Sequence, residues 1–206
     1  MAYANTACSI VCMQGYRLDT ENLEGHREHM GRLIERELRE AVNDGLIEFR
    51  VGMCMGADIW AAERAIKLRN RVFPRIRLHC HLPCETRARN WPVHWRERYF
   101  ACLNQADQVQ VLQRRYSEGC TIRRTREMID GSRRLIALYD NVAEGFIERA
   151  VSYAELLGIE SHIIQPLEGP PVQAGILGGY HALRSDQMES TYSDRFGTGK
   201  SAIKRA

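Results

Sequence analysis

The sequence predicts an α/β fold, a Rossmann-like three-layer sandwich in which helices cover both faces of a mostly parallel sheet. Strand and helix patterns alternate along most of the chain in units of about 30 residues, as in a series of βα units. The first strand candidate, residues 7–13, is nearly continuous in apolar or small residues, which is typical of a strand buried on both faces. The 206 residues, 44% of them hydrophobic, are enough for one domain with a sizeable core.

The first half of the chain is expected to contain three strands and two helices. Apolar side chains recur at helical spacing from Met30 to Val42, and Asn43, Asp44 and Gly45 then form a stop signal. The third strand is identified by its alternation of polar and apolar side chains. In chain order, these elements are a strand over 7–13, a helix over 30–42, a strand over 47–52, a helix over 58–68 and a strand over 75–82.

The second half continues the same alternation. Asn90 is the expected cap of the next helix, with Pro92 in its first turn. The remaining elements, in chain order, are that helix, a strand over 108–112, a helix over 121–130, a strand over 135–139, a helix over 145–157 and a strand over 161–165. Residues 1–166 are therefore assigned to one ligand-binding domain.

Residues 167–206 have no sustained periodicity and are rich in glycine and polar side chains. We predict that they form a tail that is either flexible or laid on a partner. Gly197 to Ser201 resembles the end of a phosphate-binding P-loop. Asp194 stands where that motif needs its first glycine, and no strand precedes it, so the P-loop is rejected.

Composition narrows the classes of partner. The formal net charge of +3 does not favour a nucleic-acid partner, although the sequence leaves it open. Only three lysines accompany 26 arginines, which reflects either codon usage or arginines that grip phosphate. The seven cysteines suit buried free thiols in a reducing cytoplasm. With no apolar run near the ~18 residues of a membrane span and no basic leader, we expect a cytoplasmic protein without a membrane partner.

The loops that follow strands one, two and five are the expected ligand edge, because ligands of parallel sheets bind beyond the carboxyl ends of the strands. Gly15 and Arg17 follow strand one, and Tyr139 and Asp140 end strand five. The loop 52–58 follows strand two and leads into a helix, where backbone N–H groups and the helix dipole favour phosphate.

Two readings of that loop stay open. Gly52 and Gly56 let the backbone approach a phosphate, with Asp58 as a ribose or phosphate-loop contact. Alternatively, the loop is a tight βα turn in which Asp58 is only the helix N-cap. The spacing matches neither a dinucleotide-binding fingerprint nor a P-loop.

No metal site is expected. His79, Cys80, His81 and Cys84 offer four potential ligands within six residues. On a strand, however, His79 and His81 share one face while Cys80 points to the other. No second Cys/His pair with matching spacing is present.

Several motifs occur in a specific order along the chain. They are Gly52-x-x-x-Gly56-Ala57-Asp58-Ile-Trp60-Ala-Ala-Glu63, Leu82-Pro83-Cys84-Glu85, Trp91 with Trp95 and Tyr99, Ala106-Asp107, Tyr116-x-x-Gly119-Cys120, Arg123-Arg124-x-Arg126-x-Met128-Ile-Asp130-x-Ser132 and the run from Leu135 to Asp140. Together these residues resemble the YpsA-like family of the SLOG superfamily, whose Rossmann-like domains are related to DprA and to LOG phosphoribohydrolases. The resemblance covers roughly residues 7–165.

The resemblance implies a nucleotide-derived ligand at the carboxyl edge of the sheet. In this picture the loop from Gly52 to Asp58, including Ala57, cradles a phosphate or ribose, and Gly15 and Arg17 form the opposite wall. Arg124 stands four residues before Met128, where LOG enzymes carry a substrate-gripping arginine. The resemblance also implies a homodimer.

Glu85, Tyr139, Asp140 and Gly145 complete the expected ligand-binding set. LOG enzymes have a Pro-Gly-Gly-x-Gly-Thr-x-x-Glu motif after strand five. Here only Gly145 of its glycines is present, and Phe146 replaces the threonine. We therefore expect a ligand-binding sensor or regulator, with no cofactor and no assigned catalytic residue.

Two alternatives stay open. One is a hydrolase of N-glycosidic or phosphoribosyl bonds, for which Glu63, Glu85 and Glu148 are the candidate carboxylates. The other is an interaction protein that acts in cell division, or on DNA through its basic tail.

Overall fold

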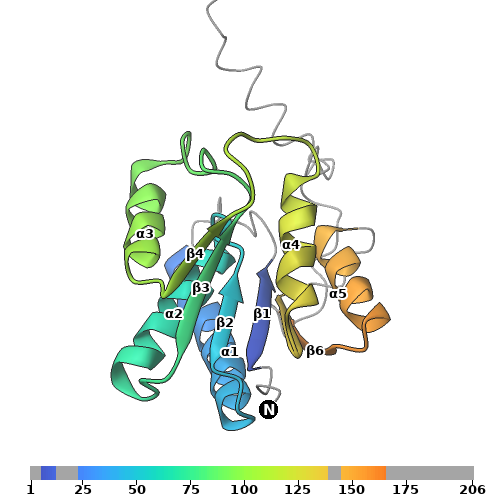
Figure 1. The fold of residues 1–206 in the computed structure, drawn as a ribbon. Helices are drawn as coiled ribbons and strands as arrows, with labels where there is room; N and C mark the ends of the chain where they lie inside the picture. The colour runs from blue at the N-terminus through green and yellow to red at the C-terminus, as the bar shows by residue number, and fades with distance from the viewer. Residues whose placement is uncertain (1–5, 13–22, 139–144, 166–206) are drawn as a thin grey trace, which may run out of the picture. The chain divides into compact units, whose positions relative to one another are not determined.

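The computed structural model describes residues 6–12, 23–138 and 145–165, and the statements below concern these residues. They form a sheet of six parallel strands in the order β4-β3-β2-β1-β5-β6 (Figure 1). The strands are β1 (Ala7–Cys12), β2 (Glu48–Val51), β3 (Arg77–Leu82), β4 (Gln108–Val111), β5 (Arg134–Leu138) and β6 (Glu160–Ile164). The expected parallel α/β architecture is confirmed.

Five helices connect the strands and lie on both faces of the sheet (Figure 1). They are α1 (Leu23–Asn43), α2 (Ala57–Arg71), α3 (Val93–Asn104), α4 (Cys120–Asp130) and α5 (Phe146–Leu156). Helix α1 begins at Leu23, seven residues before the predicted start at Met30. The sequence pattern does not reveal its first turns, because they are polar and carry no apolar period. Pro92 rather than Asn90 occupies the N-cap position of α3, so the expected Asn90 cap is wrong.

Two apolar cores lie on opposite faces of the sheet. The larger core joins α1, α2 and α3 to inward side chains of the strands such as Phe49, Leu78 and Cys80. The smaller core joins α4 and α5 to Leu135 and Ala137 of β5. This division assigns each face of the central strands to one set of helices.

The strands β2 and β3 are apolar on one face and polar on the other. His79 Nδ1 lies 3.2 Å from Glu48 Oε1, and Arg50 Nε donates to the same oxygen at 2.8 Å. Arg50 also reaches the backbone of α4, so this polar row faces α4. His79 and His81 share the face opposite Cys80, which explains the alternation of residues 75–82.

Six cysteines of the described residues are buried free thiols, as expected. Burial raises the pKa of Cys80 and of Cys102 to about 12, so both thiols stay protonated at neutral pH. None of the described helices is long and apolar enough to cross a membrane. The predicted tail, residues 167–206, lies outside the described residues.

Candidate functional site

The loop between β2 and α2 has an unusual backbone at the carboxyl edge of the sheet. Met53 is buried and has a φ of 54°, a left-handed backbone conformation that residues other than glycine rarely adopt. Gly56 has φ 103° and ψ −127°, which only glycine adopts without strain. Gly56 is the N-cap of α2, and no side chain caps the helix within the described residues.

Asp58 is not the N-cap, so the N-cap interpretation is wrong. It lies one residue inside the helix and is 3% exposed. Its Oδ2 accepts a hydrogen bond of 2.9 Å from the backbone N–H of Cys54. This hydrogen bond links the two ends of residues 54–58 and thus fixes the backbone conformation of the loop.

Gly52 is required by the position of the Arg124 guanidinium. A Cβ atom on Gly52 would lie 1.3 Å from Nη1 and 2.4 Å from Cζ of Arg124. The guanidinium therefore rests directly against the Gly52 backbone. The Arg124 side chain, which comes from α4, thus lies against the loop after β2. The resemblance implies this proximity of Arg124 and Gly52.

Three donors on one carbonyl fix the position of α4 on the sheet. The Met128 carbonyl accepts hydrogen bonds from Ser9 Oγ at 2.8 Å, from Ser132 Oγ at 2.9 Å and from Arg50 Nη1 at 3.4 Å. Arg124 lies one helical turn before Met128 on the same face. The hydrogen bonds to the Met128 carbonyl therefore also hold the Arg124 guanidinium against Gly52.

Arg124 is a buried cation that lacks a carboxylate partner among the described residues. It is 3% exposed. Its Nη1 contacts Met128 Sδ at 3.6 Å, its Nη2 contacts Cys54 Sγ at 3.4 Å, and its buried Nε has no hydrogen-bond partner. Sulfur is only a weak hydrogen-bond acceptor. A buried charge without a counter-charge costs several kcal/mol, so this position favours an anion.

A second arginine reaches the same sulfur. Arg87, in the loop between β3 and α3, has Nη2 3.7 Å from Cys54 Sγ. Arg87 is not predicted from the sequence, because nothing in the pattern distinguishes it from the neighbouring arginines of that loop. Two guanidiniums from separate elements therefore meet beside the β2–α2 loop.

His81 is affected by the positive charge of this region. It is 6% exposed. Burial lowers the pKa of His81 to about 4, and the nearby guanidiniums of Arg50 and Arg124 contribute in the same direction. The imidazole is therefore neutral at pH 7 and adds no further cation beside Arg124.

The other predicted site residues are placed less closely. Glu85 is exposed, and its Oε2 lies 3.9 Å from Nε of Arg114. Gly145 is the N-cap of α5 in an ordinary extended conformation, at φ −85°, so its backbone does not demand glycine. The structure does not bring these two residues into contact with Arg124. Gly15, Arg17, Tyr139 and Asp140 lie outside the described residues.

Of the three candidate carboxylates for hydrolysis, Glu148 lies in the first turn of α5, and the other two have structural partners or are exposed. Glu63 accepts a bidentate pair of hydrogen bonds from Arg98, at 2.7 and 2.6 Å. Glu85 has the exposed pairing with Arg114, and neither carboxylate contacts Arg124 in the described residues. Among the described residues, Arg124 forms no ion pair with a carboxylate.

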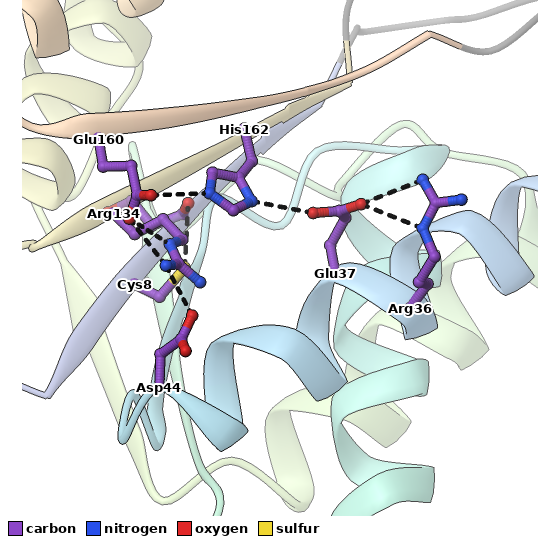
Figure 2. A network of polar contacts seen from close by, with 8 residues as sticks. Cys8, Arg36, Glu37, Asp44, Arg134, Glu160 and His162 are labelled. Carbon is purple, nitrogen blue, oxygen red and sulfur yellow. Dashed lines mark hydrogen bonds and ion pairs between the residues drawn. The ribbon is translucent and has the colours of Figure 1, made fainter.

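A separate polar network lies at the amino edge of the sheet (Figure 2). Arg134 of β5 is 6% exposed, and its Nη2 lies 2.8 Å from Asp44 Oδ2 and 2.7 Å from Glu160 Oε2. His162 lies between two carboxylates, with Nδ1 3.1 Å from Glu37 Oε2 and Nε2 3.1 Å from Glu160 Oε1. The network ties α1 to strands β5 and β6.

One group of described residues has ligand atoms close enough to hold a metal ion. Potential ligand atoms of Glu37, Glu40 and His162 lie within 4.8 Å of one another. Both ring nitrogens of His162 already face carboxylates, and Glu40 is exposed. Glu37 and His162, two of the three residues, are therefore already paired with each other in the amino-edge network.

The sheet order and the parallel strands define a Rossmann-like domain, with the Arg124 cluster at its carboxyl edge. The family model described as "YspA SLOG family" matches residues 21–166, and the chain belongs to this YpsA family of SLOG proteins.

Relatives agree with this family assignment, and one solved structure shares the fold. The UPF0398 protein of Bacillus velezensis is 30% identical over 129 residues, which cover 62% of this chain and 70% of that protein. The UPF0398 protein YpsA of Bacillus subtilis is 27% identical, covering 62% and 71%. The structure titled as the single-stranded DNA binding mode of DNA processing protein A from Helicobacter pylori matches with a TM-score of 0.51 at 14% identity. That match covers 77% of this chain and 65% of the other, and it supports the fold.

Proposed function

We propose that this SLOG protein binds the phosphate of a nucleotide-derived ligand at the β2–α2 loop and acts as a sensor or regulator. The observation that carries the proposal is the Arg124 guanidinium, buried against Gly52, whose hydrogen-bond contacts among the described residues are to sulfur alone. A phosphate beside it would supply the missing counter-charge. The uncapped N-terminus of α2 adds donors and a favourable dipole at the same edge.

Binding without turnover is favoured over hydrolysis. The residues around Gly145 lack the glycines and the threonine that form the LOG phosphate cradle. Glu63 and Glu85, two of the carboxylates that hydrolysis could use, pair with Arg98 and Arg114 and not with Arg124 among the described residues. Multiple turnovers with adenosine 5′-monophosphate, lost in Arg124→Ala, would contradict this part of the proposal. Homodimer formation and a cytoplasmic location stay predictions.

The proposal is tested by a thermal-shift screen against nucleotides, because a ligand that binds only the folded state raises the midpoint of unfolding. Arg124→Ala should weaken the binding of adenosine 5′-monophosphate by about 10- to 150-fold, the loss expected for one charge-assisted contact to phosphate. Arg124→Lys should recover part of the affinity, because an ammonium keeps the charge without the planar fork. Equal affinities of wild type and both variants in calorimetric titrations would refute the assignment.

A further inference from the structure

We infer that Arg87 is the second guanidinium of the anion site, and that the site therefore selects a terminal, doubly charged phosphate over a phosphodiester. This inference rests on the proposed function and adds the charge and connectivity of the ligand. Arg87 comes from the β3–α3 loop and Arg124 from α4, so two elements distant in sequence supply the pair.

The shared contact with Cys54 places the two guanidiniums close together. Arg124 Nη2 lies 3.4 Å and Arg87 Nη2 lies 3.7 Å from the same Sγ atom. Like charges at this spacing repel each other most strongly where water is scarce, and Cys54 is 3% exposed. An anion with two negative charges offsets that repulsion better than an anion with one.

The burial of Arg124 restricts which part of a ligand reaches it. The guanidinium rests against the Gly52 backbone, and its Nη1 contacts Met128 Sδ at 3.6 Å. A phosphodiester carries a substituent on each side of its phosphorus and is therefore harder to bring against this buried group. A phosphate monoester has one substituent and a second pKa of about 6, so it is mostly a dianion at pH 7.5.

Adenosine 5′-monophosphate and its cyclic 3′,5′-phosphodiester test the inference, because they share a base and differ in phosphate charge. By calorimetric titration at pH 7.5, wild type should bind the monoester at least about 10-fold more tightly, the difference expected for one charge-assisted contact. Arg87→Ala should remove most of this preference by weakening monoester binding, and Arg87→Lys should restore part of it. Arg89→Ala is the matched control, since Arg89 is an exposed arginine of the same loop.

A change of pH provides a second readout that a merely structural role of Arg87 would not produce. Lowering the pH from 7.5 to 5.5 protonates the monoester, so its affinity for wild type should fall while that of the cyclic diester stays constant. In Arg87→Ala, the monoester should lose most of this pH dependence.

The outcomes separate the inference from the proposed function. Equal wild-type affinities for the two nucleotides, or an unchanged preference in folded Arg87→Ala, would overturn the inference while leaving Arg124 as an anion ligand. Tighter binding of an oligonucleotide without a terminal phosphate would also overturn it in favour of a phosphodiester site. Failure of both nucleotides and of inorganic phosphate to bind would instead refute the proposed function.

Discussion

Two buried arginines at opposite edges of the sheet differ in what balances their charge. Arg134, at the amino edge, faces Asp44 and Glu160 at 2.8 and 2.7 Å (Figure 2). Arg124, at the carboxyl edge, is as deeply buried, but among the described residues its hydrogen-bond contacts are to two sulfur atoms. Each arginine leaves one buried nitrogen without a hydrogen-bond partner, so the difference between them is the counter-charge.

The contrast suggests that the fold itself stabilises one arginine and a ligand stabilises the other. Burial works to lower the pKa of Arg134, but its hydrogen bonds to Asp44 and Glu160 outweigh this effect and raise that pKa above its ordinary value. Arg134 therefore contributes to the stability of the unliganded fold. Arg124 carries an electrostatic cost that binding of an anion would remove.

The same substitution at both positions should have the largest and most unequal effect. Arg134→Met should lower the free energy of unfolding by about 2–3 kcal/mol, less than for a fully buried pair because Asp44 and Glu160 are half exposed. Arg124→Met should leave it unchanged or raise it by up to about 2 kcal/mol, because it removes an unbalanced charge. Urea denaturation without nucleotide measures both values. Similar losses at the two positions would contradict the comparison.

Gly52→Ala should disrupt the carboxyl edge without changing any charge. Its Cβ would displace the Arg124 guanidinium, so affinity for adenosine 5′-monophosphate should fall about as far as in Arg124→Ala, roughly 10- to 150-fold. The loss of stability should be at most about 1–3 kcal/mol, because the obstructing atoms belong to the end of a flexible side chain.

Gly31→Ala is the control for this variant. Its Cβ would lie 2.5 Å from Nη2 of Arg64, an arginine that is already paired with Glu28 and Glu35. It should therefore alter stability but not nucleotide affinity. A Gly52→Ala protein that keeps wild-type affinity would show that the position of Arg124 does not matter for binding.

The histidines at the two edges should titrate with opposite signs. Burial works to lower the pKa of His162, but hydrogen bonds to Glu160 and Glu37 raise it above its ordinary value. Its contribution to stability is complete below about pH 6.5 and is lost as the pH rises through the raised pKa. His81, with its pKa lowered to about 4, instead favours the fold above about pH 6.5 and costs stability as the pH falls toward 4.

The smallest expected effect is a change in the pKa of His81, which NMR titration of the two imidazoles measures. Arg124→Met should move the pKa of His81 part of the way back toward 6.5, by less than one unit, because burial is the larger cause of its shift. The same variant should leave His162 unchanged. An unaltered His81 pKa would mean that the Arg124 charge is already balanced in the free protein.

The sequence was sufficient to predict the fold because apolar periodicity determines which faces are buried. Through the resemblance it also predicted that Arg124 and Gly52 share a site, but not that the guanidinium fills the space where a Cβ of Gly52 would lie. Asp58 could not be distinguished from an N-cap, because the choice depends on which backbone N–H its carboxylate reaches. No local sequence pattern distinguishes Arg87, so only its distance to Cys54 shows that it lies beside Arg124.

The amino-edge network could not be predicted for a different reason. Glu37 and His162 are 125 positions apart, and they meet only because the strand order places β6 beside β5 and close to α1. Local spacing carries no information on such contacts. Pairs of this kind become visible only once the topology is known.

The central claim is that a ligand phosphate balances the charge of Arg124. Its most direct test is the unfolding free energy of wild type and Arg124→Met, measured by urea denaturation at increasing concentrations of adenosine 5′-monophosphate. Binding to the folded state should stabilise wild type by RT ln(1 + [L]/Kd), about 2.7 kcal/mol at one hundred times Kd, and should leave Arg124→Met almost unchanged over the same range. Equal stabilisation of both proteins, or of neither, would contradict the account.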